Sequence, residues 1–249
     1  MSETTPKIAL RSQNLKKHFG AIKAVDGVTF SLEEGTLHSI IGPNGAGKTT
    51  FFNCLTGKFP ISEGKIFFEE NEIQDIPTHK LVRLGVCRSF QILNIFKKLT
   101  VLENVRIAIQ ARHPHRFNPF IKIDRKTSEE AERILESIGL ENFKNTISQE
   151  LSHGDQRLLE IGITIATAPK VLLLDEPAAG LSKQELQKLI PVINELRKTM
   201  AIVLIEHDID MVLSLSDIIS VMSFGKIIAE GCPGEIQNNE KVRKAYLGD

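Results

Sequence analysis

The sequence predicts an α/β fold, on two observations. Short runs rich in Val, Ile and Leu alternate with longer segments that have the apolar spacing of helices. Uninterrupted apolar strands between helices are typical of a mostly parallel sheet that is covered on both faces. Two strand-like segments near the start of the chain are joined by a turn at Gly20. They indicate an antiparallel β addition on one side of the parallel core.

The expected strands follow from these patterns. The parallel core takes residues 38–41, 171–174, 201–205 and 218–222, and the antiparallel addition takes residues 8–19, 23–31 and 64–69. From about residue 96 to residue 168 the strand pattern stops and helical signals replace it. We therefore expect residues 1–95 and 169–249 to form the core with its antiparallel part, and residues 96–168 to form an inserted helical subdomain.

One helix of the insertion has start and stop signals. Thr127 and Glu130 have the spacing of a capping box, the apolar residues that follow repeat at helical spacing, and Gly139 stands at the stop position. Residues 113–124 contain two prolines and have no period, which predicts an exposed loop. His113 and His115 lie in this loop without a third ligand, so we expect no metal there.

Composition and charge exclude several classes of protein. The 249 residues fit one large domain, and 31 basic side chains balance 31 acidic ones. Proteins that neutralise nucleic-acid phosphates, or that hold anionic lipid by charge alone, usually carry a basic excess, so no nucleic-acid partner is expected. No apolar stretch approaches the ~18–20 residues of a membrane span, and the start lacks the pattern of a secretory signal. The three cysteines have no CxxC pairing, which indicates reduced structural thiols.

A phosphate-binding loop is the strongest single motif. Gly42-Pro43-Asn44-Gly45-Ala46-Gly47-Lys48-Thr49 fits G-x-x-x-x-G-K-[ST] between an expected strand and an expected helix at residues 50–55. The glycines let backbone N–H groups approach phosphates, and Lys48 supplies a charge for the β- and γ-phosphates. Thr49 offers a hydroxyl to Mg²⁺, and Thr50 can reach the α-phosphate. The sequence therefore predicts a nucleoside triphosphate as ligand.

Two acidic residues end a buried strand. Asp175 and Glu176 follow an apolar run at the carboxyl edge, where open α/β sheets bind their ligands. Burying two charges there is costly unless both have partners. We expect Asp175 to hold Mg²⁺ and Glu176 to act as the general base that orients the attacking water.

Five further segments match motifs of a single family. Residues 151–156 are Leu-Ser-His-Gly-Asp-Gln, and Gln91 lies in Arg-Ser-Phe-Gln. They resemble the LSGGQ signature and the Q-loop glutamine of the ATP-binding-cassette (ABC) ATPases. Residues 179–182 resemble the D-loop, and His207 resembles the switch histidine. Phe19 stands where the family has an aromatic residue that stacks on adenine. The resemblance covers essentially the whole chain and implies a P-loop NTPase, RecA-like core with an antiparallel β subdomain and a helical subdomain.

The resemblance also implies a mechanism. Two cassettes sandwich two ATP molecules, so that Ser152 and the N–H of Gly154 from one subunit cap the γ-phosphate held by Lys48 of the other. His207 helps to hold Glu176 and the water. Gln91 senses Mg²⁺ and the attacking water. ATP and Mg²⁺ are the implied cofactors, and a second cassette, identical or paralogous, is the implied partner.

Three residues depart from the family pattern. His153 replaces the first signature glycine, and Asp155 replaces the signature glutamine. Asp is favourable in the first turn of a helix, which favours a capping role, and the alternative is a retuned phosphate contact. Ser182 replaces the D-loop aspartate and has capping-box spacing with Glu185, so it is expected to start the next helix.

Finer features resemble the cassettes of branched-chain amino acid importers. They include residues 77–91, 99–105, 175–181 (DEPAAGL), 205–208 (IEHD) and 225–231 (GKIIAEG). The LSHG form of the signature is also similar to that of urea-type importers, so a urea, amide or other solute stays an alternative, as does a soluble ABC ATPase outside transport. The implied partners are integral membrane permease subunits and, indirectly, a solute-binding protein. The implied place is the cytoplasmic face of the cell membrane. The permease is expected to dock near Gln91, at Ile92, Leu93, Ile95 and Phe96, unless these four side chains are core.

Overall fold

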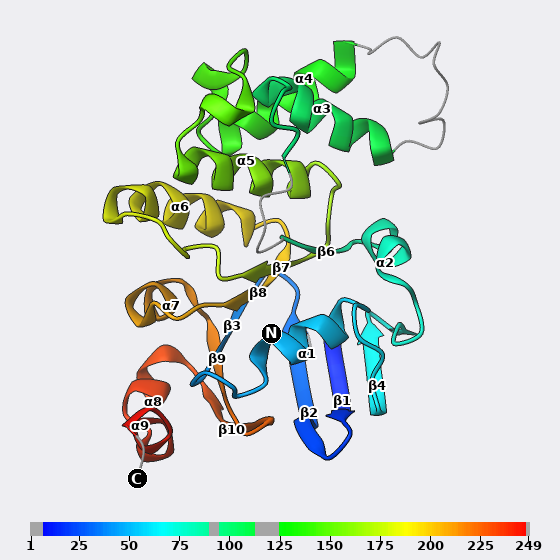
Figure 1. Cartoon of the computed structure of the whole chain (residues 1–249), viewed down its shortest axis with the longest axis vertical. Helices are drawn as coiled ribbons and strands as arrows, with labels where there is room; N and C mark the ends of the chain where they lie inside the picture. Colours follow the sequence, from blue (N-terminus) through cyan, green and yellow to red (C-terminus); the bar gives the residue numbers. More distant parts are fainter. Residues whose placement is uncertain (1–6, 90–94, 113–124, 248–249) are drawn as a thin grey trace, which may run out of the picture. The chain divides into compact units, whose positions relative to one another are not determined.

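The computed structural model describes residues 7–89, 95–112 and 125–247. The chain divides into two compact units (Figure 1). The core unit takes Met1–Arg88, Lys170–Glu176 and Arg197–Asp249, and the helical unit takes Ser89–Pro169 and Pro177–Leu196. The sequence placed residues 177–196 in the core, whereas they group here with the helices. The assignment of the whole chain to a single ATPase domain stays a prediction.

A six-stranded sheet forms the centre of the core unit. Its strand order is β10-β9-β3-β8-β7-β6, with β10 antiparallel and the others parallel. The bounds are β3 (Leu37–Ile41), β6 (Val86–Arg88), β7 (Val171–Asp175), β8 (Ala201–Ile205), β9 (Ile218–Ser223) and β10 (Lys226–Gly231). Every residue of β3, β7 and β8 is buried, as uninterrupted apolar strands require. The predicted parallel core is therefore confirmed.

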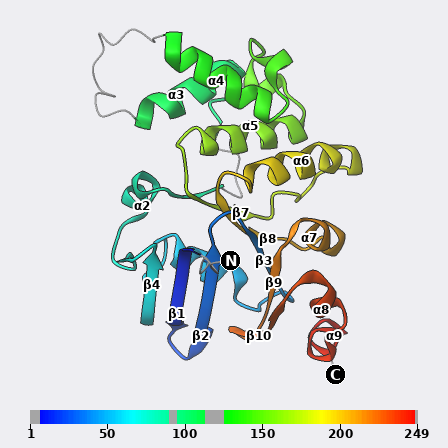
Figure 2. The same cartoon turned by 180° about the vertical axis from the view of Figure 1, so that it is seen from behind.

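A second, antiparallel sheet completes the predicted α/β architecture. Its order is β2-β1-β4-β5, with β1 (Ile8–Phe19), β2 (Ile22–Glu33), β4 (Glu63–Phe68) and β5 (Asn71–Glu72). Viewed from behind, β1, β2 and β4 lie side by side (Figure 2). Helix α1 (Lys48–Leu55) buries Phe51, Phe52 and Leu55 in one apolar cluster with residues of both sheets. This cluster fixes the helix that follows the phosphate-binding loop.

The remaining helices of the core unit are short. They are α2 (Thr78–Leu84), α7 (Ile209–Leu215), α8 (Pro233–Gln237) and α9 (Glu240–Leu247). Val212, Ile236 and Val242 pack from α7, α8 and α9 against Ile219 and Val221 of β9. The sheet therefore has an apolar cover on this face as well.

The helical unit contains α3 (Val101–Arg112), α4 (Arg125–Ser137), α5 (His153–Ile165) and α6 (Lys183–Leu196), with 3₁₀ turns at Glu141–Phe143 and Ser148–Glu150. The expected helix near residue 130 is α4, and Gly139 follows it with a φ of 72°. The capping box at Thr127 is wrong, because α4 already begins at Arg125 and Thr127 is buried inside it. The expected loop at residues 113–124, with His113 and His115, lies outside the described residues.

Two expectations about the whole chain can be compared with the fold. Cys54, Cys87 and Cys232 are all free thiols, and burial raises the pKa of Cys54 to about 11. Among the described residues, no helix is both long enough and apolar enough to cross a membrane.

Candidate active site

The phosphate-binding loop connects β3, in the middle of the parallel sheet, to α1. Two of its glycines are required by close backbone contacts. A Cβ on Gly42 would lie 2.1 Å from the carbonyl oxygen of Met222, and one on Gly47 would lie 2.2 Å from that of Ala24. Both also have positive φ, 150° and 101°, which L side chains rarely adopt. Any larger residue at these positions would displace the loop.

Lys48 is the first residue of α1 and is 6% exposed. Its ammonium donates to the carbonyl oxygens of Gly42 at 2.6 Å and Pro43 at 3.1 Å, which folds the side chain back along the loop. Burial lowers its pKa from 10.5, while the charges of Glu176 and Asp175 act in the opposite direction. Thr49 is exposed and Thr50 is half-buried on the same turn.

Asp175 ends β7 and is fully buried, with an exposed fraction of 0%. Its Oδ2 forms an ion pair with Nη2 of Arg88, the last residue of β6, while Nη1 of Arg88 donates to Oδ1 of Asn53 at 2.6 Å. Parallel pairing places Arg88 opposite Leu173, two residues before Asp175. The guanidinium therefore links the carboxylate strand to α1 and holds Asp175 in one orientation.

Glu176 follows at a φ of 49°, in the left-handed region that is rare for a residue with a side chain. Such outliers persist where the surrounding structure fixes them, often in functional sites. Its N–H donates to the carbonyl of Ile205 at 2.9 Å, and its Oε1 lies 3.0 Å from Nε2 of His207. His207 follows β8, and its own N–H donates to the buried carboxylate of Glu206 at 3.0 Å.

Several of these groups line one cavity of about 400 Å³ in the core unit, within the range of small-molecule sites. It is lined by residues 44–50, Glu176 and His207, together with residues 22–24 and 224–225. Phe19, the expected adenine platform, is not among the described residues that line it. Its ring packs edge to face on Phe59 at 5.6 Å, with the ammonium of Lys17 4.9 Å from the ring centre.

Ser152 and Gly154 lie in the helical unit, at the start of α5. Ser152 caps the helix by accepting from the N–H of Asp155 at 3.1 Å, and its hydroxyl donates to Oδ2 of Asp155 at 2.8 Å. The other oxygen of Asp155 lies 3.0 Å from Nζ of Lys188. Asp155 lies in the first turn of α5, where Asp is favourable, but the side chain that caps the helix is that of Ser152.

The N–H of Gly154 has a partner that the sequence did not predict. It donates to Oε1 of Glu185 at 2.8 Å. Oε2 of Glu185 accepts from the N–H and the hydroxyl of Ser182, so the expected capping box at the start of α6 is confirmed. These hydrogen bonds, first those from Ser182 and then that from Gly154, lower the pKa of Glu185 from 4.5.

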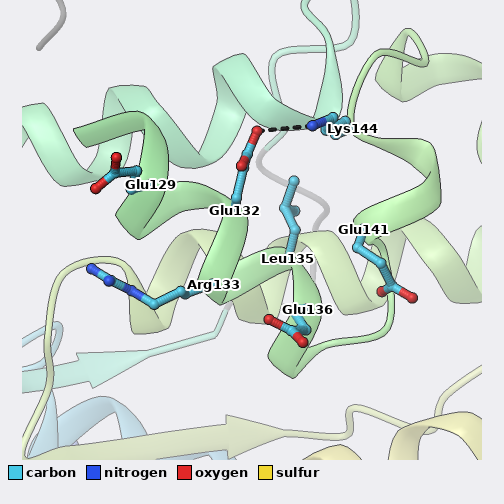
Figure 3. Close-up of a pocket in the computed structure, with 7 residues that line it drawn as sticks. All are labelled: Glu129, Glu132, Arg133, Leu135, Glu136, Glu141 and Lys144. Atoms are coloured by element: carbon cyan, nitrogen blue, oxygen red, sulfur yellow. Dashed lines mark hydrogen bonds and ion pairs between the residues drawn. The ribbon is translucent and has the colours of Figure 1, made fainter. Parts of the chain in front are cut away.

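A second cavity, of about 420 Å³, lies in the helical unit (Figure 3). Leu135 and six charged side chains line it, and Lys144 is paired with Glu132 at 2.9 Å. None of the motifs found in the sequence falls on these residues, so we place the active site in the core unit. Gln91, and Ile92 and Leu93 of the expected docking site, lie outside the described residues. Among those described there is no cluster of three or more His, Cys, Asp or Glu side chains suited to a metal.

Comparison with known proteins identifies the family of this chain. Residues 25–179, more than half of the chain, match the model of the ABC transporter family. The chain belongs to this family. Residues 226–249 of the cassette match the model of the branched-chain amino acid ATP-binding cassette transporter. The resemblance stated from the motifs is confirmed, and the cassette is an ATPase, as predicted.

Relatives of the cassette match over nearly its whole length. It is 42% identical to the high-affinity branched-chain amino acid transport ATP-binding protein BraF of Pseudomonas aeruginosa, covering 96% of this chain and 98% of that protein. It is 39% identical to a probable LivG of Archaeoglobus fulgidus, covering 96% and 95%. Among solved structures, an ATP-binding cassette of an ABC transporter in its ADP conformation has a TM-score of 0.86 at 35% identity, covering 97% of this chain and 99% of that one.

Proposed function

We propose that this cassette is the ATP-hydrolysing subunit of a branched-chain amino acid importer and drives a membrane permease by ATP-dependent dimerisation. One observation carries the proposal for the chemistry. Lys48, Glu176 and His207 converge on one cavity of the core unit, next to a glycine-rich loop that leaves room for phosphates. The names of the relatives with about 40% identity support the cargo.

The loop residues 42–47 and Lys48 would hold the triphosphate. Lys48 already lies among the loop carbonyls, so it would exchange its bond to Gly42 or Pro43 for one to a β- or γ-phosphate oxygen. Thr50 would reach the α-phosphate from the first turn of α1. Phe19 is proposed to stack on the adenine.

Thr49 and Asp175 would hold Mg²⁺, with Gln91 as a third contact. Their hydroxyl and carboxylate oxygens are ligands that Mg²⁺ prefers, and the contact with Arg88 orients the Asp175 carboxylate. When bound, the ion would neutralise charge on the β- and γ-phosphates. Because the Asp175 side chain is fully buried, we propose that it holds the ion through a bridging water molecule.

Glu176 is the proposed general base. Its carboxylate lines the cavity, and the contact with Nε2 of His207 fixes one of its oxygens. His207 would thereby orient Glu176 toward the water that attacks the γ-phosphate, and would itself contact that phosphate. Gln91 is proposed to sense the same water.

Ser152 and Gly154 are proposed to complete the site of a second cassette, of the same or a paralogous chain. In each subunit these two donors already serve carboxylates of their own helical unit, Asp155 and Glu185. A γ-phosphate of the partner would have to replace both acceptors. Closure of the pair therefore exchanges internal hydrogen bonds for bonds to ATP.

The remaining partners follow from the importer proposal. Integral permease subunits would hold the cassette at the cytoplasmic face of the cell membrane, and a solute-binding protein would act on it indirectly. Co-expression with the neighbouring genes and affinity purification tests this. A polytopic membrane protein should co-purify, and vesicles that contain the complex should take up labelled leucine when loaded with ATP.

The proposed cargo and the proposed role in transport can be refuted separately. Uptake of urea in place of leucine, abolished by Lys48→Ala, would favour the urea or amide alternative suggested by the LSHG signature. Recovery of the cassette without a membrane partner would favour a soluble ABC ATPase outside transport.

A further inference from the structure

Phe224 is exposed to a degree that the fold does not explain. It lies in the turn between β9 and β10, and at 91% it is the most exposed large apolar residue among those described. Because its ring is almost fully in water, Phe224 gains no stabilisation from apolar burial. Its side chain therefore does not contribute to the apolar core of the unit.

The backbone of this turn also disfavours phenylalanine. Phe224 and Gly225 are the two loop residues between Ser223 and Lys226, and their φ values are 45° and 77°. Two-residue turns with positive φ at both positions strongly prefer Asn-Gly or Asp-Gly. Phenylalanine is an unfavourable residue type both for this backbone conformation and for this degree of exposure. Such a residue is a candidate for a functional role.

The turn is fixed to the phosphate-binding loop. The N–H of Gly225 donates to the carbonyl of Ala46 at 2.9 Å, and the carbonyl of Gly225 accepts from the N–H of Asp26 at 2.8 Å. Gly225 also packs so closely that a Cβ would meet the carbonyl oxygens of Lys23 and Ala24 at 2.9 and 3.0 Å. Phe224 is therefore held beside both the loop and the end of the β1–β2 hairpin.

Phe224 lines the cavity that holds Lys48, Glu176 and His207. Most of its lining is formed by the loop and by charged or hydroxyl side chains. The large apolar side chains that line it are Ile22, which is 69% exposed, and Phe224. An ATP molecule has the same division, with a charged triphosphate at one end and a flat aromatic base at the other.

We propose that Phe224, together with Ile22, contacts the purine base of the nucleotide whose phosphates the loop binds. The inference rests on the proposed function and adds a base-contacting residue to it. Aromatic side chains stack on bases through their faces, which gives affinity for the base and none for the phosphates. Phe224 thus discriminates a nucleotide from a base-free polyphosphate.

The test compares ADP with inorganic tripolyphosphate, measured by calorimetry on the full-length chain. ADP is used because one subunit can bind it without ATP-driven pairing. Phe224→Asn should weaken ADP binding at least fivefold and leave tripolyphosphate binding within twofold. Because Asn suits the turn, the variant should unfold at the same temperature as the wild type or higher. Phe224→Trp should restore ADP binding.

Two further variants separate the explanations. Phe143→Asn changes an exposed phenylalanine of the helical unit and should leave ADP binding unchanged. Phe224→Ala replaces Phe224→Asn if the latter does not fold.

The inference is overturned if ADP affinity changes less than twofold, or if binding of ADP and binding of tripolyphosphate weaken equally. Loss of ATP-driven dimerisation with unchanged ADP binding would also overturn it, and would make Phe224 a subunit contact. Absence of binding of both ligands to the wild type would instead refute the proposed function.

Discussion

Nε2 of His207 lies 3.0 Å from Oε1 of Glu176, although the two residues follow different strands, β8 and β7. The parallel register pairs Asp175 with Ile205, so the ends of both strands reach the same edge. The histidine fixes one carboxylate oxygen next to a backbone that is already in a rare conformation. This arrangement fixes the orientation of the proposed general base.

Glu176→Gln should retain ATP binding and hydrolyse ATP at least ~100-fold more slowly, because the general base is lost. Phosphate release under single-turnover conditions measures the step directly. Glu63→Gln, which changes an exposed carboxylate of β4 that pairs with Lys16 and is not among the residues lining the cavity, should hydrolyse ATP normally. Near-normal turnover of Glu176→Gln would remove Glu176 from this role.

His207→Ala should lower the hydrolysis rate through Glu176. Residues that act as one unit have non-additive effects, so the double variant with Glu176→Gln should be hardly slower than Glu176→Gln alone. If the two losses multiplied, His207 would act independently of Glu176, for example on the phosphate alone.

Arg88→Gln should lower the free energy of unfolding by roughly 3–5 kcal/mol, because it leaves the buried Asp175 without its counter-charge. Urea denaturation measures this. Arg112→Gln breaks a partly exposed pair with Glu130 and should cost less than about 1 kcal/mol. If both variants lowered the free energy of unfolding equally, the buried ion pair with Asp175 would stabilise the fold no more than the partly exposed pair does.

The stability that Glu185 contributes should depend on pH. Its pKa is lowered from 4.5 by hydrogen bonds from Ser182 and Gly154, so the charged form is favoured in the folded chain. The contribution is therefore complete above pH 4.5 and is lost as the pH falls through the lower, folded-state pKa. The difference in urea midpoint between the wild type and Glu185→Gln should shrink on acidification. A difference that is constant with pH would contradict this.

Phe96→Asp should stay soluble and bind ATP but lose the permease, because its side chain is 55% exposed while its backbone is held by Asn104. Ile95→Asp is the matched variant and should misfold, since Ile95 is 9% exposed. Co-purification with the permease separates the outcomes. Retention of the permease by Phe96→Asp would exclude this segment as the docking site.

Patterns among residues close in the sequence predicted the features that depend on short-range interactions, namely buried strands, the phosphate-binding loop and a helix cap. Continuous apolar runs identified β3, β7 and β8, and the phosphate-binding loop was evident from its spacing alone. The capping box of Ser182 with Glu185 was predicted because the two residues lie three positions apart. The same rule failed at Thr127, where α4 begins two residues earlier.

Contacts between distant residues could not be predicted in the same way. The ion pair of Arg88 with Asp175 depends on the register of β6 with β7, and the bond from Gly154 to Glu185 spans 31 residues. Phe224 did leave a signal, a phenylalanine before a glycine between two strands. Its meaning became clear only when the turn was found beside the phosphate-binding loop.

ATP hydrolysis by the reconstituted complex of cassette, permease and solute-binding protein tests the central claim most directly. The account predicts that leucine stimulates hydrolysis, that urea does not, and that Glu176→Gln abolishes the stimulated rate. Hydrolysis that is indifferent to leucine, or that persists in Glu176→Gln, would contradict it.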